Sequence, residues 1–123
     1  MKRHERDLDL IDVILDDCAV LSRRVERFGM TRDSFCNDRS EDGEIAYDAV
    51  MSPVYRIAED ALHLSDDVMD EYPNYAWNDI RGFRNFVAHG YREVDRGMAW
   101  GVVERDIPEL GRILAEYRDE HPL

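Results

Sequence analysis

The sequence has few cysteines, no long apolar run and comparatively little positive charge. Its two cysteines, Cys18 and Cys36, form no C-x-x-C pair and are too few for a disulfide framework or a zinc finger. No apolar run approaches the ~20 residues that span a bilayer. The charged start is not followed by the apolar stretch of a signal peptide. These absences predict a reduced cytoplasmic protein without a membrane segment.

Acidic residues dominate the charge: 28 Asp and Glu stand against 16 Lys and Arg, for a formal net charge of −12. This excess argues against broad binding to nucleic acid or an anionic membrane, so neither a DNA nor a membrane partner is expected. It permits a local basic site and suits docking to a basic protein partner. The length of 123 residues predicts one domain over residues 1–123.

Apolar residues recur at three- and four-residue steps along most of the chain, which predicts amphipathic helices. The expected helices cover about residues 6–28, 44–71, 78–89 and 95–117. Gly29 and Gly90 mark two of the expected ends, and a kink or break is expected near Pro53 and at Pro108. Residues 30–43 form a polar connection with room for one helical turn. No sustained alternation indicates a strand, so the predicted fold is an all-α antiparallel bundle of four to five helices.

The apolar stripes define the expected core. Cys18 lies on the first stripe and is interpreted as a small core residue. Trp77 and Trp100 are expected core anchors, and Asn78 or Asp79 is a good N-cap for the third helix. Three further stripe positions near the ends of predicted helices are Phe28, Ile45 and Met98.

A locally basic stretch covers residues 80–92 and contains no carboxylate. Its three arginines are Arg81, Arg84 and Arg92. Within it, Arg84, His89 and Tyr91 lie close to the end of the third predicted helix. A histidine can move protons near neutral pH, and an arginine fork can bind a phosphate and stabilise charge on it. Together they suffice for metal-independent RNA cleavage, in which the 2′-hydroxyl attacks the neighbouring phosphate.

Helical geometry constrains how these residues cooperate. Asn85 and His89 share a face, about 40° apart, whereas Arg84 lies about 140° from His89. They converge on one ligand only if the helix turns at Gly90 or if a second subunit contributes. Because cleavage needs both a base and an acid, a symmetric dimer would supply a second histidine. From spacing alone, an arginine and a histidine on one helix are more often surface ion-pair and capping residues.

The motif and its surroundings resemble the HepT-like proteins of the HEPN superfamily, whose RX4HXY motif corresponds to Arg84, His89 and Tyr91. The matching context comprises Tyr72-Pro73, Trp77, Ile80, Phe83, Asn85, Gly90, Val94-Asp95, Trp100 and Asp106-Ile107-Pro108-x-Leu110. The stretch IAEDA at residues 57–61 is similar to the family's I-G-E-A, with alanine in place of glycine and an extra acidic residue. The similarity covers about residues 51–117, and the first 50 residues agree mainly in helical pattern.

The resemblance implies a HEPN-type bundle that forms a homodimer with its motif helices at the interface. It also implies an endoribonuclease toxin of a type VII toxin–antitoxin system, whose partner is a minimal nucleotidyltransferase antitoxin. Arg84 would bind the scissile phosphate, His89 would act as acid and base, and Asn85 would orient substrate or histidine. Tyr91 would be the acceptor of AMP from the antitoxin. This chemistry needs no metal and no other cofactor.

Simpler interpretations stay open. Arg84 and His89 would then be a capping and interface pair, Tyr91 a packed interface residue and Asn85 a structural hydrogen-bonding residue. For the whole protein, the alternatives are a noncatalytic HEPN module that binds a nucleotide or a nucleotidyltransferase, and a purely structural helical dimer.

Outside the motif, few residues suggest chemistry. Arg81 and Arg92 are candidate RNA contacts or solvated surface charges. The acidic residues between 66 and 71 are interpreted as a solvated face rather than a metal site. The remaining histidines, which have no partner nearby in the sequence, are His4, His63 and His121.

Overall fold

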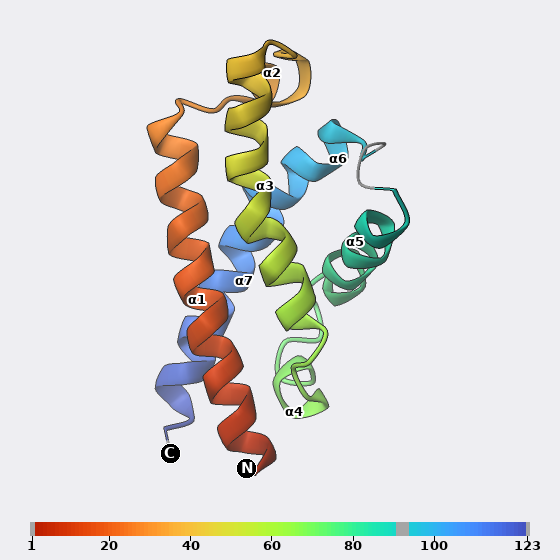
Figure 1. Ribbon diagram of the computed structural model, residues 1–123. Coiled ribbons are helices and arrows are strands. Elements are labelled where there is room, and N and C mark those ends of the chain that lie inside the picture. Colours follow the sequence, from red (N-terminus) through yellow and green to blue (C-terminus); the bar gives the residue numbers. More distant parts are fainter. Residues whose placement is uncertain (1, 91–93, 123) are drawn as a thin grey trace.

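The computed structural model describes the backbone of residues 2–90 and 94–122 and the side chains of residues 2–83 and 94–122. Its elements, in chain order, are α1 (Arg3–Arg27), α2 (Arg32–Asn37), α3 (Glu41–Ala61), α4 (Asp66–Met69), α5 (Trp77–Gly90), α6 (Arg96–Gly101), the π-helical turn η2 (Val102–Asp106) and α7 (Ile107–Glu120). These residues include no strand (Figure 1), so the all-α prediction is confirmed. None of the described helices is long and apolar enough to cross a bilayer.

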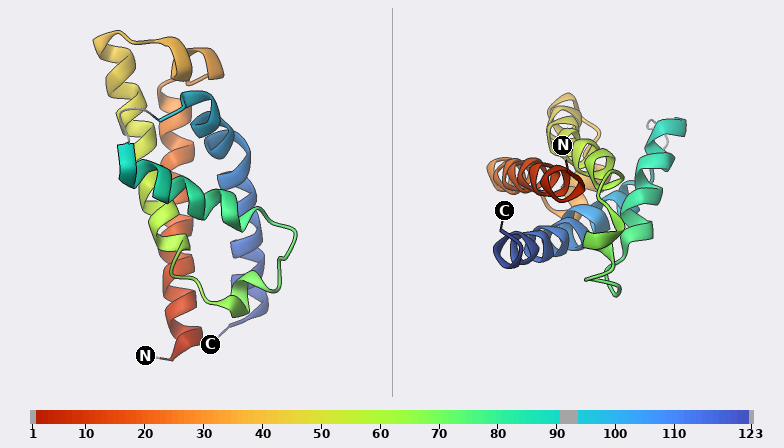
Figure 2. Two further views of the ribbon diagram at one scale, coloured as in Figure 1. Left: turned by 90° about the vertical axis from the view of Figure 1, so that its right-hand side faces the viewer. Right: turned by 90° about the horizontal axis from the view of Figure 1, so that it is seen from below.

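Three long helices form the bundle. α1 packs against α3 and α7 and runs antiparallel to both, which brings the two ends of the chain to one end of the molecule (Figure 1). α5 packs against α3 and lies across the bundle rather than along it (Figure 2). The helix that carries most of the motif therefore crosses the scaffold on the side of α3 away from α1.

α1 follows the predicted apolar pattern. Cys18 packs half-buried against the core, as expected. The helix is followed by Gly29, whose φ of 55° is the left-handed conformation that glycine adopts without strain. The fully covered apolar residues of α1 are Leu8, Ile11, Ile14 and Leu21.

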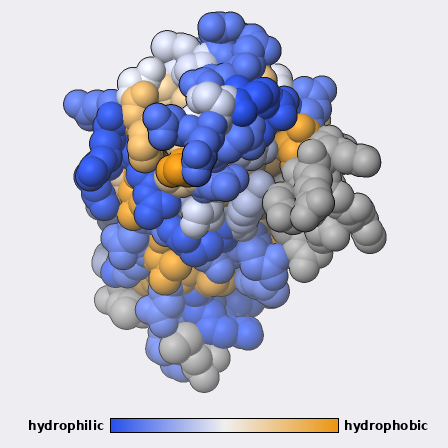
Figure 3. All heavy atoms as spheres, turned by 45° about the horizontal axis from the view of Figure 1, so that its top comes forward, coloured by the Kyte–Doolittle hydropathy of each residue, from blue (hydrophilic) through white to orange (hydrophobic). Residues whose placement is uncertain are grey.

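Three residues expected on apolar stripes are exposed instead. Phe28, Ile45 and Met98 have exposed fractions of 41%, 55% and 46%. Phe28 directly follows the last residue of α1, Met98 lies in the first turn of α6 and Ile45 is the fifth residue of α3. All three are therefore close to a helix end, where neighbouring helices do not cover them. Figure 3 looks onto this end of the bundle, where apolar areas are small and separated by hydrophilic ones. Helical spacing predicts which face is apolar, but not where the covering helices stop.

The second predicted helix, residues 44–71, is divided into α3 and α4. α3 begins early because the Ser40 hydroxyl accepts a hydrogen bond from the Gly43 N–H (3.1 Å). It ends at Ala61, after which the carboxylate of Asp7 on α1 accepts hydrogen bonds from the backbone N–H (3.0 Å) and the hydroxyl of Ser65. Because Asp7 lies 58 residues from Ser65 in the sequence, no local sequence pattern predicts that α3 ends here.

α3 passes through Pro53 without the break that the sequence suggested as one option. Its ribbon changes direction near the middle of the helix (Figure 1). A proline inside a helix costs about 3 kcal/mol, and complete burial of Val50, Val54 and Ile57 in the core offsets this cost. Packing therefore holds together a helix that local propensity alone would divide.

α6, η2 and α7 correspond to the fourth predicted helix. Asp95 caps α6 by accepting a hydrogen bond from the Met98 N–H (3.1 Å). The π-helical turn η2 then leads into α7, whose first turn contains Pro108. The helix is not interrupted at Pro108: the expected change falls just before it, where the π-helical turn η2 gives way to the first turn of α7. Trp100 is buried as expected (6% exposed).

Candidate functional site

α5 carries the first part of the predicted motif. Its backbone is helical through Gly90, so Arg84, Asn85 and His89 belong to one helix. The side chains of residues 84–90 lie outside the described residues, and so do Tyr91 and Arg92 altogether. Convergence of these side chains on one ligand therefore stays a prediction. What the structure shows is how the chain is held on both sides of the motif.

The start of α5 is held by buried aromatic residues. The helix begins at Trp77, before the predicted N-cap at Asn78 or Asp79, so that cap prediction is wrong. Trp77 is 8% exposed, and its indole N–H donates a hydrogen bond to the Tyr72 carbonyl (2.9 Å). Its ring meets that of Tyr75 edge to face at 4.8 Å. Trp77 is thus a core anchor, as predicted, and it fixes the position of the first helical turn.

Tyr75 connects this turn to η2. Its hydroxyl donates a hydrogen bond to the carbonyl of Asp106 (2.6 Å). Burial raises the pKa of Tyr75 far above its usual range, with a further contribution from the Asp106 carboxylate. The hydroxyl therefore remains a donor throughout the physiological range. Nothing in the local sequence distinguishes this tyrosine from the others.

Arg81, a candidate RNA contact, lies against the end of α3. Its Nη2 donates to the carbonyl of Leu62 (3.4 Å), and its Nε is buried without a hydrogen-bond partner in the described part of the protein. The side chain is half-buried, and its neighbours in the helix, Ile80 and Phe83, are both covered. This placement gives Arg81 a packing role, and RNA contact by its remaining donors stays a prediction.

The chain after the motif is held by Arg96, which the sequence did not single out. Its side chain is 9% exposed, and its Nη2 lies 2.9 Å from both carboxylate oxygens of Glu44 on α3. The guanidinium lies 3.6 Å from the centroid of the Tyr47 ring, and its Nη1 donates to the Phe35 carbonyl (3.3 Å). Arg96 thereby joins the start of α6 to α2 and α3.

Aromatic packing completes this second attachment. The Phe35 ring lies 5.0 Å from Tyr47 and 5.2 Å from Trp100, centroid to centroid. Burial raises the pKa of Tyr47, an effect that the positive charge of Arg96 partly opposes. Val94, directly after the undescribed residues, is also buried (8% exposed). The motif region is thus bounded by two attachments that are firmly packed.

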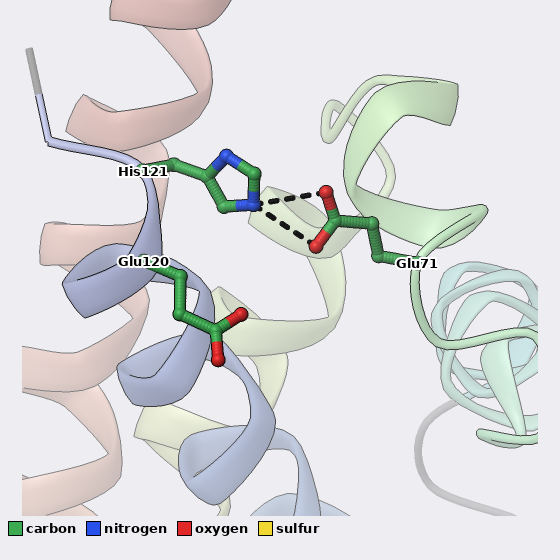
Figure 4. A group of neighbouring side chains, drawn as sticks. All are labelled: Glu71, Glu120 and His121. Atoms are coloured by element: carbon green, nitrogen blue, oxygen red, sulfur yellow. Dashed lines mark hydrogen bonds and ion pairs between the residues drawn. The ribbon is translucent and has the colours of Figure 1, made fainter.

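A separate group of possible metal ligands lies near the C-terminal end. One ligand atom from each of Glu71, Glu120 and His121 falls within 4.8 Å of the others. Figure 4 shows the imidazole of His121 directed at Glu71, with Nε2–O distances of 2.9 and 3.0 Å. The ring also stacks on Tyr117 at 4.1 Å. This geometry describes a hydrogen-bonded contact that attaches the end of α7 to the turn after α4, and we assign it no metal role.

Cys18 offers no nucleophile. Burial, with a smaller contribution from Asp17, raises the pKa of its thiol to about 12. The thiol is therefore protonated at neutral pH and unreactive. Asp17 itself is buried and is matched by Arg56, whose Nε and Nη2 donate to it at 3.1 and 2.9 Å. These groups serve the packing of α1 on α3.

Comparison with known proteins identifies the class. The family model described as "Ribonuclease HepT-like" matches residues 19–117, from the middle of α1 to near the end of α7. The chain belongs to this family, and the resemblance inferred from the motif is confirmed. The match also extends into α1, where the sequence had indicated only a shared helical pattern.

Individual relatives agree with this assignment. A protein of Methanocaldococcus jannaschii described as "Putative RNase" is 29% identical over 80 residues, which cover 65% of this chain and 72% of that protein. One of Caldanaerobacter subterraneus subsp. tengcongensis with the same description is 24% identical over 106 residues, covering 86% and 88%. A second M. jannaschii protein, described as "Gamma-glutamylcyclotransferase and putative RNase", is 26% identical over 92 residues, 72% of this chain but 41% of that protein. No solved structure matches the chain significantly.

Proposed function

We propose that this chain is a metal-independent endoribonuclease and the toxin of a toxin–antitoxin pair. The observation that carries the proposal is the ribonuclease family match over residues 19–117, a range that includes the whole of α5. The descriptions of the relatives as RNases support the same activity. Arg84 and His89, both on α5, are the proposed catalytic residues.

In the proposed reaction the 2′-hydroxyl of RNA attacks the adjacent phosphorus, and the bond from phosphorus to the 5′-oxygen breaks. His89 takes the proton of the 2′-hydroxyl, and an acid protonates the leaving 5′-oxygen. Arg84 binds the non-bridging oxygens and stabilises the charge that develops on them. Asn85 orients the substrate or the imidazole. The products are a 2′,3′-cyclic phosphate and a 5′-hydroxyl.

A homodimer completes this scheme. One histidine acts poorly as base and acid in the same step, whereas two protomers with facing α5 helices would supply one of each. The position of α5 supports this arrangement, because the helix crosses one side of the bundle and is not enclosed by α1 and α7 (Figure 2). The proposed dimer therefore uses the α5 side of each protomer.

The proposed antitoxin is a nucleotidyltransferase that modifies Tyr91. The tyrosine oxygen would attack the α-phosphorus of ATP, with pyrophosphate as the leaving group. The attached AMP places a negative phosphate two residues from His89, where it would repel the RNA backbone. Silencing then needs no change in fold.

The test is cleavage of total RNA by the purified chain in EDTA, beside Arg84→Ala and His89→Ala. Both substitutions should lower the rate at least about 100-fold, and the products should carry 2′,3′-cyclic phosphates. Arg112→Ala, which removes an exposed arginine of α7 that pairs with Glu109, is the matched control and should cleave normally. Intact mass establishes that the protein tested is unmodified. Absence of cleavage by the unmodified chain would refute the enzyme and favour the noncatalytic binding module.

A further inference from the structure

The last two turns of α1 form one wall of a groove whose other wall is the first half of α3. The groove is lined by Val20, Arg23, Arg24, Glu26, Arg27, Phe28, Asp48 and Ala49. The spacing of positions 20, 23, 24 and 27 places them on one face of α1. Three arginines therefore project along a single helix face, in a chain whose net charge is −12.

The arginines of this face differ in how they are satisfied. Arg24 donates from Nη1 to the Ala49 carbonyl (2.7 Å), which fixes it to α3. Arg23 and Arg27 are exposed, and within the described part of the chain neither has a carboxylate within 4.0 Å. By contrast Arg56 is paired with Asp17, and Arg96 with Glu44. The groove thus presents two guanidinium groups that the protein itself does not use.

Phe28 adds an exposed aromatic ring beside these charges. It is 41% exposed and stands at the end of α1. Gly29, with its φ of 55°, ends the helix directly after it. Arginines that bind phosphates, together with an aromatic ring on which a base stacks, are the combination by which proteins hold single-stranded nucleic acid without sequence preference.

We propose that this groove binds the backbone of single-stranded RNA, with Arg23 and Arg27 on phosphates and Phe28 stacked on a base. The proposal rests on the proposed function, since it assigns a second contact to the RNA that the motif cleaves. Glu26 and Asp48 at the rim limit the net charge of the groove, so its binding is weak and salt-sensitive. Its contribution is to the capture of substrate and not to the chemical step.

The position of the groove determines which RNAs can use it. α1 and α5 pack on different sides of α3 (Figure 1), so the groove and the motif helix do not share a face of one protomer. A strand that reaches both must continue well beyond the scissile phosphate. The groove therefore lowers KM for long RNAs and leaves short oligonucleotides unaffected.

Fluorescence anisotropy with a labelled RNA of about 16 nucleotides tests this binding. The RNA carries 2′-O-methyl groups, because without a 2′-hydroxyl it cannot be cleaved by the unmodified chain. The double variant Arg23→Ala/Arg27→Ala should bind about tenfold more weakly. It should also lower the slope of log K against log salt by about 1.4, since each contact with single-stranded nucleic acid contributes about 0.7. Phe28→Ala should weaken binding several-fold without a change of slope.

The matched control is Arg112→Ala/Arg118→Ala, which removes two arginines from α7, where they pair with Glu109 and Asp12. Both double variants change the net charge equally, so only a local site distinguishes them. The control should change affinity less than about twofold. Equal weakening by the two double variants, or an unchanged slope in the groove variant, would overturn the proposal.

Cleavage assays separate this proposal from the proposed function. Arg23→Ala/Arg27→Ala should raise KM for a long RNA about tenfold, with kcat unchanged and a short oligonucleotide cleaved normally. If Arg84→Ala and His89→Ala abolish cleavage while the groove variants change neither KM nor affinity, only the groove proposal fails. If the groove variants lose affinity while Arg84→Ala and His89→Ala cleave normally, only the assignment of the motif fails.

Discussion

The two attachments that bound the motif region are built from different interactions. Before the motif, Trp77 and Tyr75 hold α5 by buried aromatic surface and by hydrogen bonds between neutral groups. After the motif, Arg96 holds the start of α6 by a nearly buried cation shared between Glu44 and Tyr47.

Because they are built differently, the two attachments can be weakened in different ways. An attachment made of apolar surface weakens in proportion to the surface removed and is not screened by salt. One made around a buried cation depends on the planar fork of the arginine as well as on its charge. Substitutions at the two places should therefore differ in magnitude, in salt dependence and in what a conservative replacement restores.

The largest effect is expected at the first attachment. Trp77→Ala should lower the free energy of unfolding by about 3–5 kcal/mol, the usual cost of deleting a buried tryptophan side chain. Urea denaturation measures it, and the loss should be the same at low and high salt. Trp77→Phe, which keeps an aromatic ring but loses the N–H donor, should cost less than half as much. A loss below about 1 kcal/mol for the alanine variant would contradict the role given to this residue.

At the second attachment Arg96→Ala should cost about 2 kcal/mol. This is less than the 3–5 kcal/mol of a fully buried pair, because the Glu44 side chain is 41% exposed and can be hydrated once unpaired. Arg96→Lys keeps the charge but cannot contact both carboxylate oxygens and the Phe35 carbonyl with a planar fork. It should restore less than half of the loss, and full rescue by lysine would show that charge alone matters.

Tyr75→Phe should be milder, at about 1 kcal/mol, because it removes one hydrogen bond and no apolar surface. Tyr72→Phe is the matched control: its hydroxyl is buried without a hydrogen-bond partner among the described residues, so its removal should be neutral or slightly stabilising. Thermal denaturation of both variants in one buffer makes the comparison. Equal destabilisation would show that the bond to Asp106 contributes nothing.

The sequence predicted what depends on local spacing. The range of α1, the start of a helix at Asp95 and the change of helix type just before Pro108 follow from neighbouring residues, and the structure has all three. The family could be identified for a similar reason. Arg84, His89 and Tyr91 lie within one short stretch, and the residues that flank it follow in the same order as in the family.

Contacts between distant residues could not be predicted in this way. Asp7 meets Ser65 across 58 residues, Glu44 meets Arg96 across 52, and Glu71 meets His121 across 50. Each depends on how whole helices are placed, which a pattern within one helix does not encode. The same reason explains why Arg96 and Tyr75, which hold the motif region, gave no signal in the sequence, whereas the motif did.

Glu44→Gln should give an effect no larger than that of Tyr75→Phe, and it tests the second attachment most specifically. The amide keeps one acceptor for the Arg96 fork while removing the negative charge, so the guanidinium stays hydrogen-bonded and stacked on Tyr47. We expect a loss of about 1 kcal/mol at low salt, consistent with a charge-assisted bond replaced by a neutral one. The difference in stability between the wild type and the variant should be only partly removed by 1 M salt. The Arg96 side chain is 9% exposed, so the ion pair in the wild type is poorly screened. If the variant and the wild type became equally stable in 1 M salt, the pair would be a screened surface contact, and the distinction between the two attachments would fail.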